Sequence, residues 1–126
     1  MLVKIKSISM NENQCIVEFT SKYGDGYGVW HGIPQIGKEY EVEIEITNSL
    51  RWGTDIKITN ERMEMISKEY QLLKLNGELQ HVYDDQLAVL KIGSSMIFLE
   101  TEGNAFPEGS SIQIKVPLIH IYDTNI

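Results

Sequence analysis

The segment 38–47, KEYEVEIEIT, alternates apolar and charged residues without a break from Glu39 to Ile46. Successive side chains of a β-strand point to opposite faces, so this alternation is typical of a strand with one buried and one solvated face. Apolar residues spaced three and four positions apart, which would indicate an amphipathic helix, are nearly absent from the chain. The pattern therefore restricts the chain to β-rich folds.

The same alternation recurs along the chain, interrupted about every 8–12 residues by turn-forming residues. Segment 60–69 is ambiguous, because its methionines alternate as in a strand while Met63, Ile66 and Tyr70 would suit a helical turn. Segment 70–84 is long enough for one strand or for two. About nine short strands predict an all-β fold, an antiparallel barrel or sandwich. The segments predicted as strands are 2–10, 15–20, 27–32, 38–47, 50–59, 70–84, 86–92, 94–102 and 111–123.

Two stretches of the chain share one form. Segments 32–46 and 104–118 each place a proline and a nearby glycine before a strongly alternating strand, and the strand pairs that precede them also match. At 126 residues the chain has the length of one domain. We therefore predict a single domain, 1–126, with a meander-like internal repeat of approximately 1–48 and 70–123 and a connector at 49–69. One barrel and two fused sheets both fit this repeat.

The charge balance is acidic, with 18 Asp and Glu against 11 Lys and Arg and a net charge of −7. An acidic excess repels nucleic-acid backbones and favours basic partners, although it also simply keeps a small protein soluble. No apolar run approaches the 18 or so residues that span a bilayer, and the N-terminal MLVKIKSISM lacks the apolar core of a signal peptide. Cys15 is the only cysteine, so no intrachain disulfide can form. We expect a cytoplasmic protein without membrane association.

Catalytic and metal-binding patterns are lacking. The three histidines, His31, His81 and His120, are far apart and form no H-x-x-x-H motif, and no G-x-S-x-G motif occurs. We therefore predict a non-enzymatic protein without a metal or other cofactor. A catalytic site assembled from distant residues such as His120, Tyr122 and Asp123 stays open as an alternative.

The glycine-rich segment 23–32, YGDGYGVWHG, has two interpretations. It could present an aromatic platform for nucleic-acid bases or sugars, or its tryptophan could plug the end of a barrel. Lys22 is the only cation nearby, whereas a base-stacking groove usually carries several, so the sequence favours the core plug. The platform would make the protein a small β-barrel module for single-stranded nucleic acid or oligosaccharide. Its residues would be Tyr23, Tyr27, Trp30 and His31.

Four glutamates share one face of the 38–47 strand: Glu39, Glu41, Glu43 and Glu45. Carboxylates repeating about every 6.6–6.8 Å repel one another unless cations lie opposite. The face is either solvated and paired with Lys4, Lys6 or Lys57, or it docks a basic partner. In the docking interpretation, Glu100 and Glu102 could extend the acidic surface, and two aromatic residues would anchor the partner. The predicted partner-binding residues are Glu41, Glu43, Glu45, Asp84, Asp85, Trp52 and Tyr27.

Segments 33–58, IPQIGKEYEVEIEITNSLRWGTDIKI, and 119–126, IHIYDTNI, resemble small, acidic, all-β bacterial immunity proteins of toxin–immunity pairs, including contact-dependent inhibition systems. The resemblance implies a cytosolic inhibitor that binds the C-terminal domain of a cognate toxin, often a basic nuclease. It rests on strand and turn patterns, and it carries over no site residue. Together with the charge balance, it leads to the hypothesis of an inhibitor that covers a basic toxin cleft with carboxylates.

Overall fold

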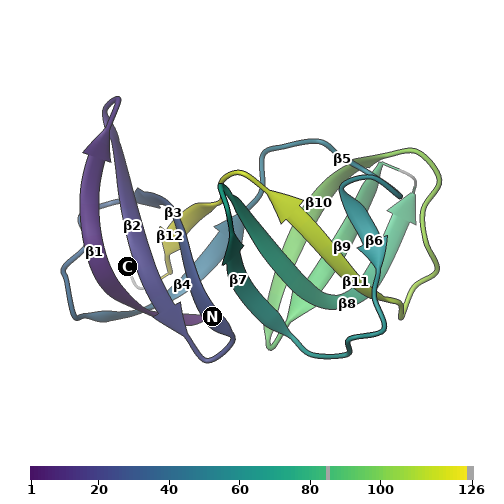
Figure 1. The fold of residues 1–126 in the computed structure, drawn as a ribbon, viewed down its shortest axis with the longest axis horizontal. Helices are drawn as coiled ribbons and strands as arrows, with labels where there is room; N and C mark the ends of the chain where they lie inside the picture. The colour runs from purple at the N-terminus through teal and green to yellow at the C-terminus, as the bar shows by residue number, and fades with distance from the viewer. Residues whose placement is uncertain (85, 125–126) are drawn as a thin grey trace.

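The computed structural model describes residues 1–84 and 86–124, and in these ranges the chain forms twelve β-strands and no helix (Figure 1). The predicted all-β fold is confirmed, with more strands than predicted. Within the same ranges nothing has the length and apolar character of a membrane-spanning helix. The strands are β1 (Leu2–Asn11), β2 (Gln14–Ser21), β3 (Gly24–His31), β4 (Glu39–Glu45), β5 (Leu50–Arg51), β6 (Ile56–Ile58), β7 (Met65–Glu69), β8 (Leu72–Asp84), β9 (Leu87–Ile92), β10 (Ser95–Glu102), β11 (Ser111–Val116) and β12 (His120–Asp123).

The strands form two units that lie side by side (Figure 1). The first is a closed barrel in the order β1-β2-β3-β12-β4. Its closure depends on β12, which pairs antiparallel with β4 and parallel with β3, so that Tyr122 lies beside both Glu43 and His31. The C-terminal strand thus brings residues far apart in the sequence onto one outer face of the barrel.

The second unit is a nearly closed sheet in the order β5-β10-β9-β8-β11-β6, with β7 paired to β8. Strand β8 is a single strand of 13 residues whose first half pairs with β7 and β11, whereas its second half pairs with β9. The β5–β10 pairing is parallel, as is β3–β12, so the sheets are mixed rather than purely antiparallel.

The ambiguous segment 60–69 contains the strand β7, so the helical alternative is wrong there. Pairing with β8 accounts for this, because a hairpin turn at residues 70–71 places the two segments side by side. The internal repeat stays a prediction. Strand β12, from the predicted second copy, closes the first barrel, and β5, β6 and β7 of the predicted connector belong to the second sheet.

The two units are joined where β3 crosses β7. The Ile66 amide donates a hydrogen bond of 2.9 Å to the Tyr23 carbonyl. The Tyr27 hydroxyl lies 3.0 Å from the Gln71 carbonyl oxygen and 3.1 Å from that of Pro117, between which it shares its hydrogen bond. Buried apolar side chains of both units form one continuous hydrophobic cluster. The junction is therefore part of the core, and it holds the barrel against the second sheet.

Candidate functional site

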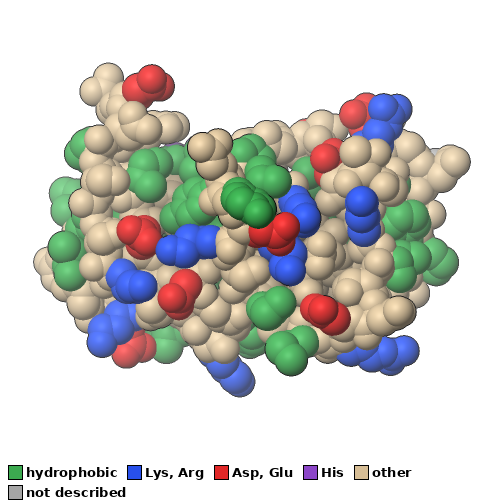
Figure 2. Space-filling model, in the orientation of Figure 1, with side chains coloured by type: hydrophobic (Ala, Val, Ile, Leu, Met, Phe, Trp, Pro, Cys, Tyr) green, Lys and Arg blue, Asp and Glu red, His purple; other side chains and the backbone are tan. Residues whose placement is uncertain are grey.

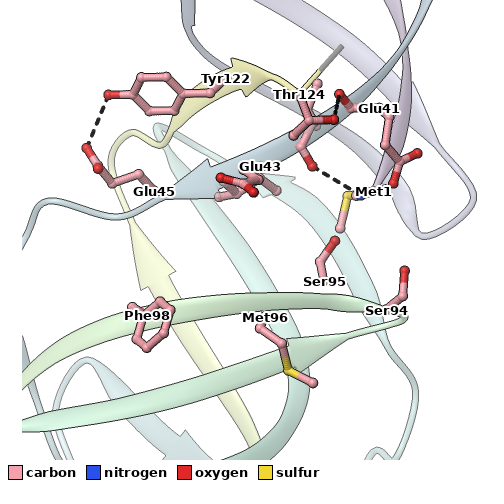
Figure 3. Close-up of a pocket in the computed structure, with 12 residues that line it drawn as sticks. Met1, Glu41, Glu43, Glu45, Ser94, Ser95, Met96, Phe98, Tyr122 and Thr124 are labelled. Atoms are coloured by element: carbon pink, nitrogen blue, oxygen red, sulfur yellow. Dashed lines mark hydrogen bonds and ion pairs between the residues drawn. The ribbon is translucent and has the colours of Figure 1, made fainter. Parts of the chain in front are cut away.

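A groove of about 660 Å³ opens between the two units (Figure 3). One wall is β4, from which Glu41, Glu43 and Glu45 project, and the other is β10, which contributes Met96 and Phe98. A smaller cavity of about 280 Å³ shares lining residues with this groove. The described residues that line the groove are Met1, Glu41, Val42, Glu43, Ile44, Glu45, Ser94, Ser95, Met96, Phe98, Tyr122 and Thr124.

The carboxylate wall follows from the alternation of β4. Val42 and Ile44 are buried in the barrel, so the glutamates between them must point outward, as the sequence predicts. Two of these glutamates accept hydrogen bonds. Glu41 takes one of 2.9 Å from the Met1 amino group, and Glu45 takes one of 3.4 Å from the Tyr122 hydroxyl.

The lysines predicted to neutralise this face lie elsewhere. In the part of the chain that the structure describes, Lys4, Lys6 and Lys57 form no ion pair with the β4 glutamates, and Glu43 forms no ion pair at all. Lys6 instead lies 3.7 Å from Asp25. The Met1 amino group pairs with Glu41, whereas Glu43 and Glu45 keep a negative charge that no described ion pair compensates.

The opposite wall is apolar and open to solvent. Phe98 is 58% exposed and Met96 is 49% exposed, although both are large hydrophobic side chains. Exposed aromatic and methionine side chains are enriched at protein–protein interfaces. Sequence reasoning missed both residues. The alternation of segment 94–102 could have identified them, because Met96 and Phe98 lie on the same strand face as the charged Glu100 and Glu102, which is expected to be exposed.

Charge is distributed differently on the face shown in Figure 2 than in the groove. On the face shown in Figure 2, acidic and basic side chains are interspersed. Lys68 lies 3.0 Å from Glu18, and Lys115 lies 3.2 Å from Glu69. By contrast, no lysine or arginine is among the described residues that line the groove. The groove thus concentrates carboxylates beside an apolar wall.

The other predicted partner-binding residues do not join this groove. Trp52 is only 7% exposed and packs edge-on against Phe106, with 5.2 Å between ring centroids, so it is not available as an exposed anchor. The Tyr27 hydroxyl is used at the junction of the two units. Asp84, at the end of β8, accepts a hydrogen bond of 2.7 Å from the Gln86 amide. Asp85 lies outside the described residues.

The glycine-rich segment 23–32 supplies strand β3 rather than an aromatic loop. Trp30 is 3% exposed and meets Tyr40 edge-on, with 4.7 Å between ring centroids. Trp30 is thus a core residue, and whether it plugs the end of the barrel stays a prediction. The Trp30 ring is therefore not available to stack on a base or a sugar, although His31 at the end of the strand is exposed.

A polar cluster adjoins the groove on the outer face of the barrel. His31 Nε2 lies 2.9 Å from His120 Nδ1, and Tyr122 stacks on His31 with ring centroids 4.3 Å apart. Burial raises the pKa of the Tyr122 hydroxyl, and the negative charge of Glu45 raises this pKa further. The sequence alternative named His120 and Tyr122 together with Asp123, but Asp123 follows Tyr122 directly in the strand and so points to the opposite face. No spacing signal could have revealed that His31 lies beside His120, because the two histidines are 89 residues apart.

Within residues 1–84 and 86–124, no group of three or more histidine, cysteine, aspartate and glutamate side chains is arranged to hold a metal ion. The arrangement offers an acidic groove with one apolar wall, which suits binding through charge and apolar contact. Comparison of the chain with protein-family models, curated proteins and solved structures finds no match.

Proposed function

We propose that this protein is a non-enzymatic, protein-binding inhibitor, an immunity protein that neutralises a basic, nuclease-type toxin domain. One observation carries the proposal: three glutamates of β4 line the groove opposite the exposed Met96 and Phe98, and among the described lining residues the only positive group is the Met1 amino group, which pairs with Glu41. The carboxylates would occupy the position that substrate phosphates take in the basic cleft of the toxin. A single cysteine fits action in the reducing cytosol.

The two walls would contribute differently. The carboxylates would attract a basic surface from a distance, which speeds association and excludes acidic partners. Desolvation of exposed apolar side chains then slows dissociation, because aromatic anchors supply much of the binding energy in interfaces of this kind. The proposed complex therefore forms quickly at low salt and more slowly as salt screens the charges.

A triple charge reversal tests this proposal. The tagged protein is used to capture its partner from a lysate of its source organism, with elution on a salt gradient, and the captured basic protein is then purified. Against that protein, the variant Glu41→Lys, Glu43→Lys, Glu45→Lys should lose at least about tenfold in association rate and also lose affinity in low salt, because attraction at the groove becomes repulsion. Surface plasmon resonance over a salt series measures both quantities.

A matched variant separates local from overall charge. Glu12→Lys, Glu61→Lys, Glu78→Lys changes the net charge equally at exposed positions outside the groove. It should keep most of the association rate. If the two triple variants bind equally well, the groove is not the binding surface and the proposal fails.

A further inference from the structure

Strand β10 has one paired edge and one edge that is largely open. Along its length it pairs with β9, from Ser95 opposite Ile92 to Glu100 opposite Leu87. Its other edge is covered only at Thr101 and Glu102, where β5 pairs in parallel. In the ranges that the structure describes, no backbone pairing covers this edge before Thr101.

The backbone hydrogen bonds show which groups face the open edge. The Thr101 amide donates toward β9, to the Gln86 carbonyl, whereas the Glu102 carbonyl accepts from the Trp52 amide on the other side. Backbone groups of successive residues in a strand point to alternate edges. Met96 and Phe98 are separated from Glu102 by an even number of positions along β10, so their N–H and C=O groups point to the same edge as those of Glu102, the open edge.

This open edge lies at the groove. Met96 and Phe98 line it together with the three glutamates of β4 (Figure 3). A strand carrying unpaired N–H and C=O groups is a template for another strand, and natural proteins usually cover such an edge. Here the groove of about 660 Å³ lies beside it, with carboxylates on the far wall.

We propose that an extended, basic segment of the partner adds to β10 as a further β-strand along Met96–Phe98. This inference rests on the proposed function and specifies its binding mode. Main-chain hydrogen bonds to β10 would give affinity, while alternate side chains would contact the apolar wall and the carboxylates. Charge complementarity selects the occupant, because lysine or arginine neutralises Glu43 and Glu45, which form no ion pair among the described residues. A second copy of this chain would bring the same three carboxylates and a further net charge of −7.

Amide exchange with a synthetic peptide tests the inference. The probe is the extended peptide Ac-KTKVKTK-NH2, and the comparison peptide Ac-ETEVETE-NH2 replaces each lysine by glutamate. Hydrogen exchange of the Met96 and Phe98 amides, followed by NMR in low salt, should slow by about tenfold or more with saturating basic peptide and not with the acidic one. The Ile97 amide, which already faces β9, serves as an internal reference.

A proline variant removes the proposed donor without touching the β9 ladder. Met96→Pro deletes an N–H that faces the open edge, a position at which strands tolerate proline. Met96→Val loses the same side chain but keeps the N–H. The proline variant should bind the basic peptide at least about tenfold more weakly than the valine variant, because strand addition needs that N–H.

The outcomes separate the binding mode from the proposed function. If the peptide binds through the glutamates but the two amides gain no protection, or if the proline and valine variants bind equally, strand addition is wrong while the acidic groove still docks the partner. Failure of the basic peptide to bind the wild-type protein at millimolar concentration also overturns the inference. So does protection of these amides by self-association at rising protein concentration without peptide. The exchange measurement on the wild type decides the matter even if the proline variant does not fold.

Discussion

Gly24 passes so close to a neighbouring backbone that no side chain fits. Its φ is +130°, and a Cβ added to it would lie 2.0 Å from the Ile66 carbonyl oxygen. That oxygen belongs to β7, so the contact lies at the junction of the two units. The absence of a single methyl group at this position allows the barrel and the second sheet to meet.

Gly24→Ala should therefore lower the free energy of unfolding by about 3 kcal/mol or more, because the clash adds to the strain of a positive φ. Gly109→Ala is the matched control, since Gly109 also has a positive φ, +87°, but nothing lies within 4 Å of its added Cβ. It should cost only about 1–2 kcal/mol. Urea unfolding measures both values, and equal losses would show that the contact with Ile66 relaxes freely.

At the element scale, an ion pair links β2 to β7. Lys68 Nζ lies 3.0 Å from Glu18 Oε2, and the hydrogen bond from Lys68 lowers the pKa of Glu18, with a further contribution from Ser7. A carboxyl whose pKa is lowered on folding stabilises the native state above its unfolded pKa. This contribution is lost as the pH falls through the folded pKa.

Lys68→Gln should thus destabilise the protein at neutral pH by less than about 1 kcal/mol, because the pair is solvent-exposed. The difference from the wild type should shrink as the pH falls below about 4.5, the ordinary pKa of a glutamate. Urea unfolding at a series of pH values measures this. Lys57→Gln, at a lysine without an ion pair among the described residues, is the control. A pH-independent loss in the Lys68 variant would argue for packing rather than charge.

Over the whole molecule, the two units share one hydrophobic core and each contains one tryptophan. Trp30 lies in β3 of the barrel, and Trp52 directly follows β5 of the second sheet. An isolated β-bridge pairs Trp52 with Ile56, the first residue of β6. Both are buried in the same apolar cluster. A continuous core favours a single cooperative transition over separate unfolding of the two units.

Single-tryptophan variants check this cooperativity. Fluorescence of Trp30→Phe reports the second sheet through Trp52, and fluorescence of Trp52→Phe reports the barrel through Trp30. In each variant the urea midpoint from fluorescence should coincide with that from far-ultraviolet circular dichroism, which senses both units. Midpoints that differ between the two probes within one variant would show that barrel and sheet unfold independently.

Much of the local structure was predictable from side-chain alternation. Apolar residues recur at every second position of segment 38–47, which predicts the strand β4. Because the fold must bury these apolar residues, Glu41, Glu43 and Glu45 must point outward. The burial of Trp30 was favoured by the scarcity of nearby cations. Trp52 was misjudged as an anchor, because its burial depends on Phe106, which is 54 positions away in the sequence.

Pairing between distant strands lay beyond such reasoning. Alternation says which face of a strand is buried, but not which strand lies beside it, since many pairings satisfy the same periodicity. Only tertiary contacts place β12 between β3 and β4, bring His31 to His120, and set β10 across a groove from β4 with one edge open. The acidic face is thus a local property of ten consecutive residues. Its conversion into a groove with an apolar wall is a long-range property, created when two units pack around one core.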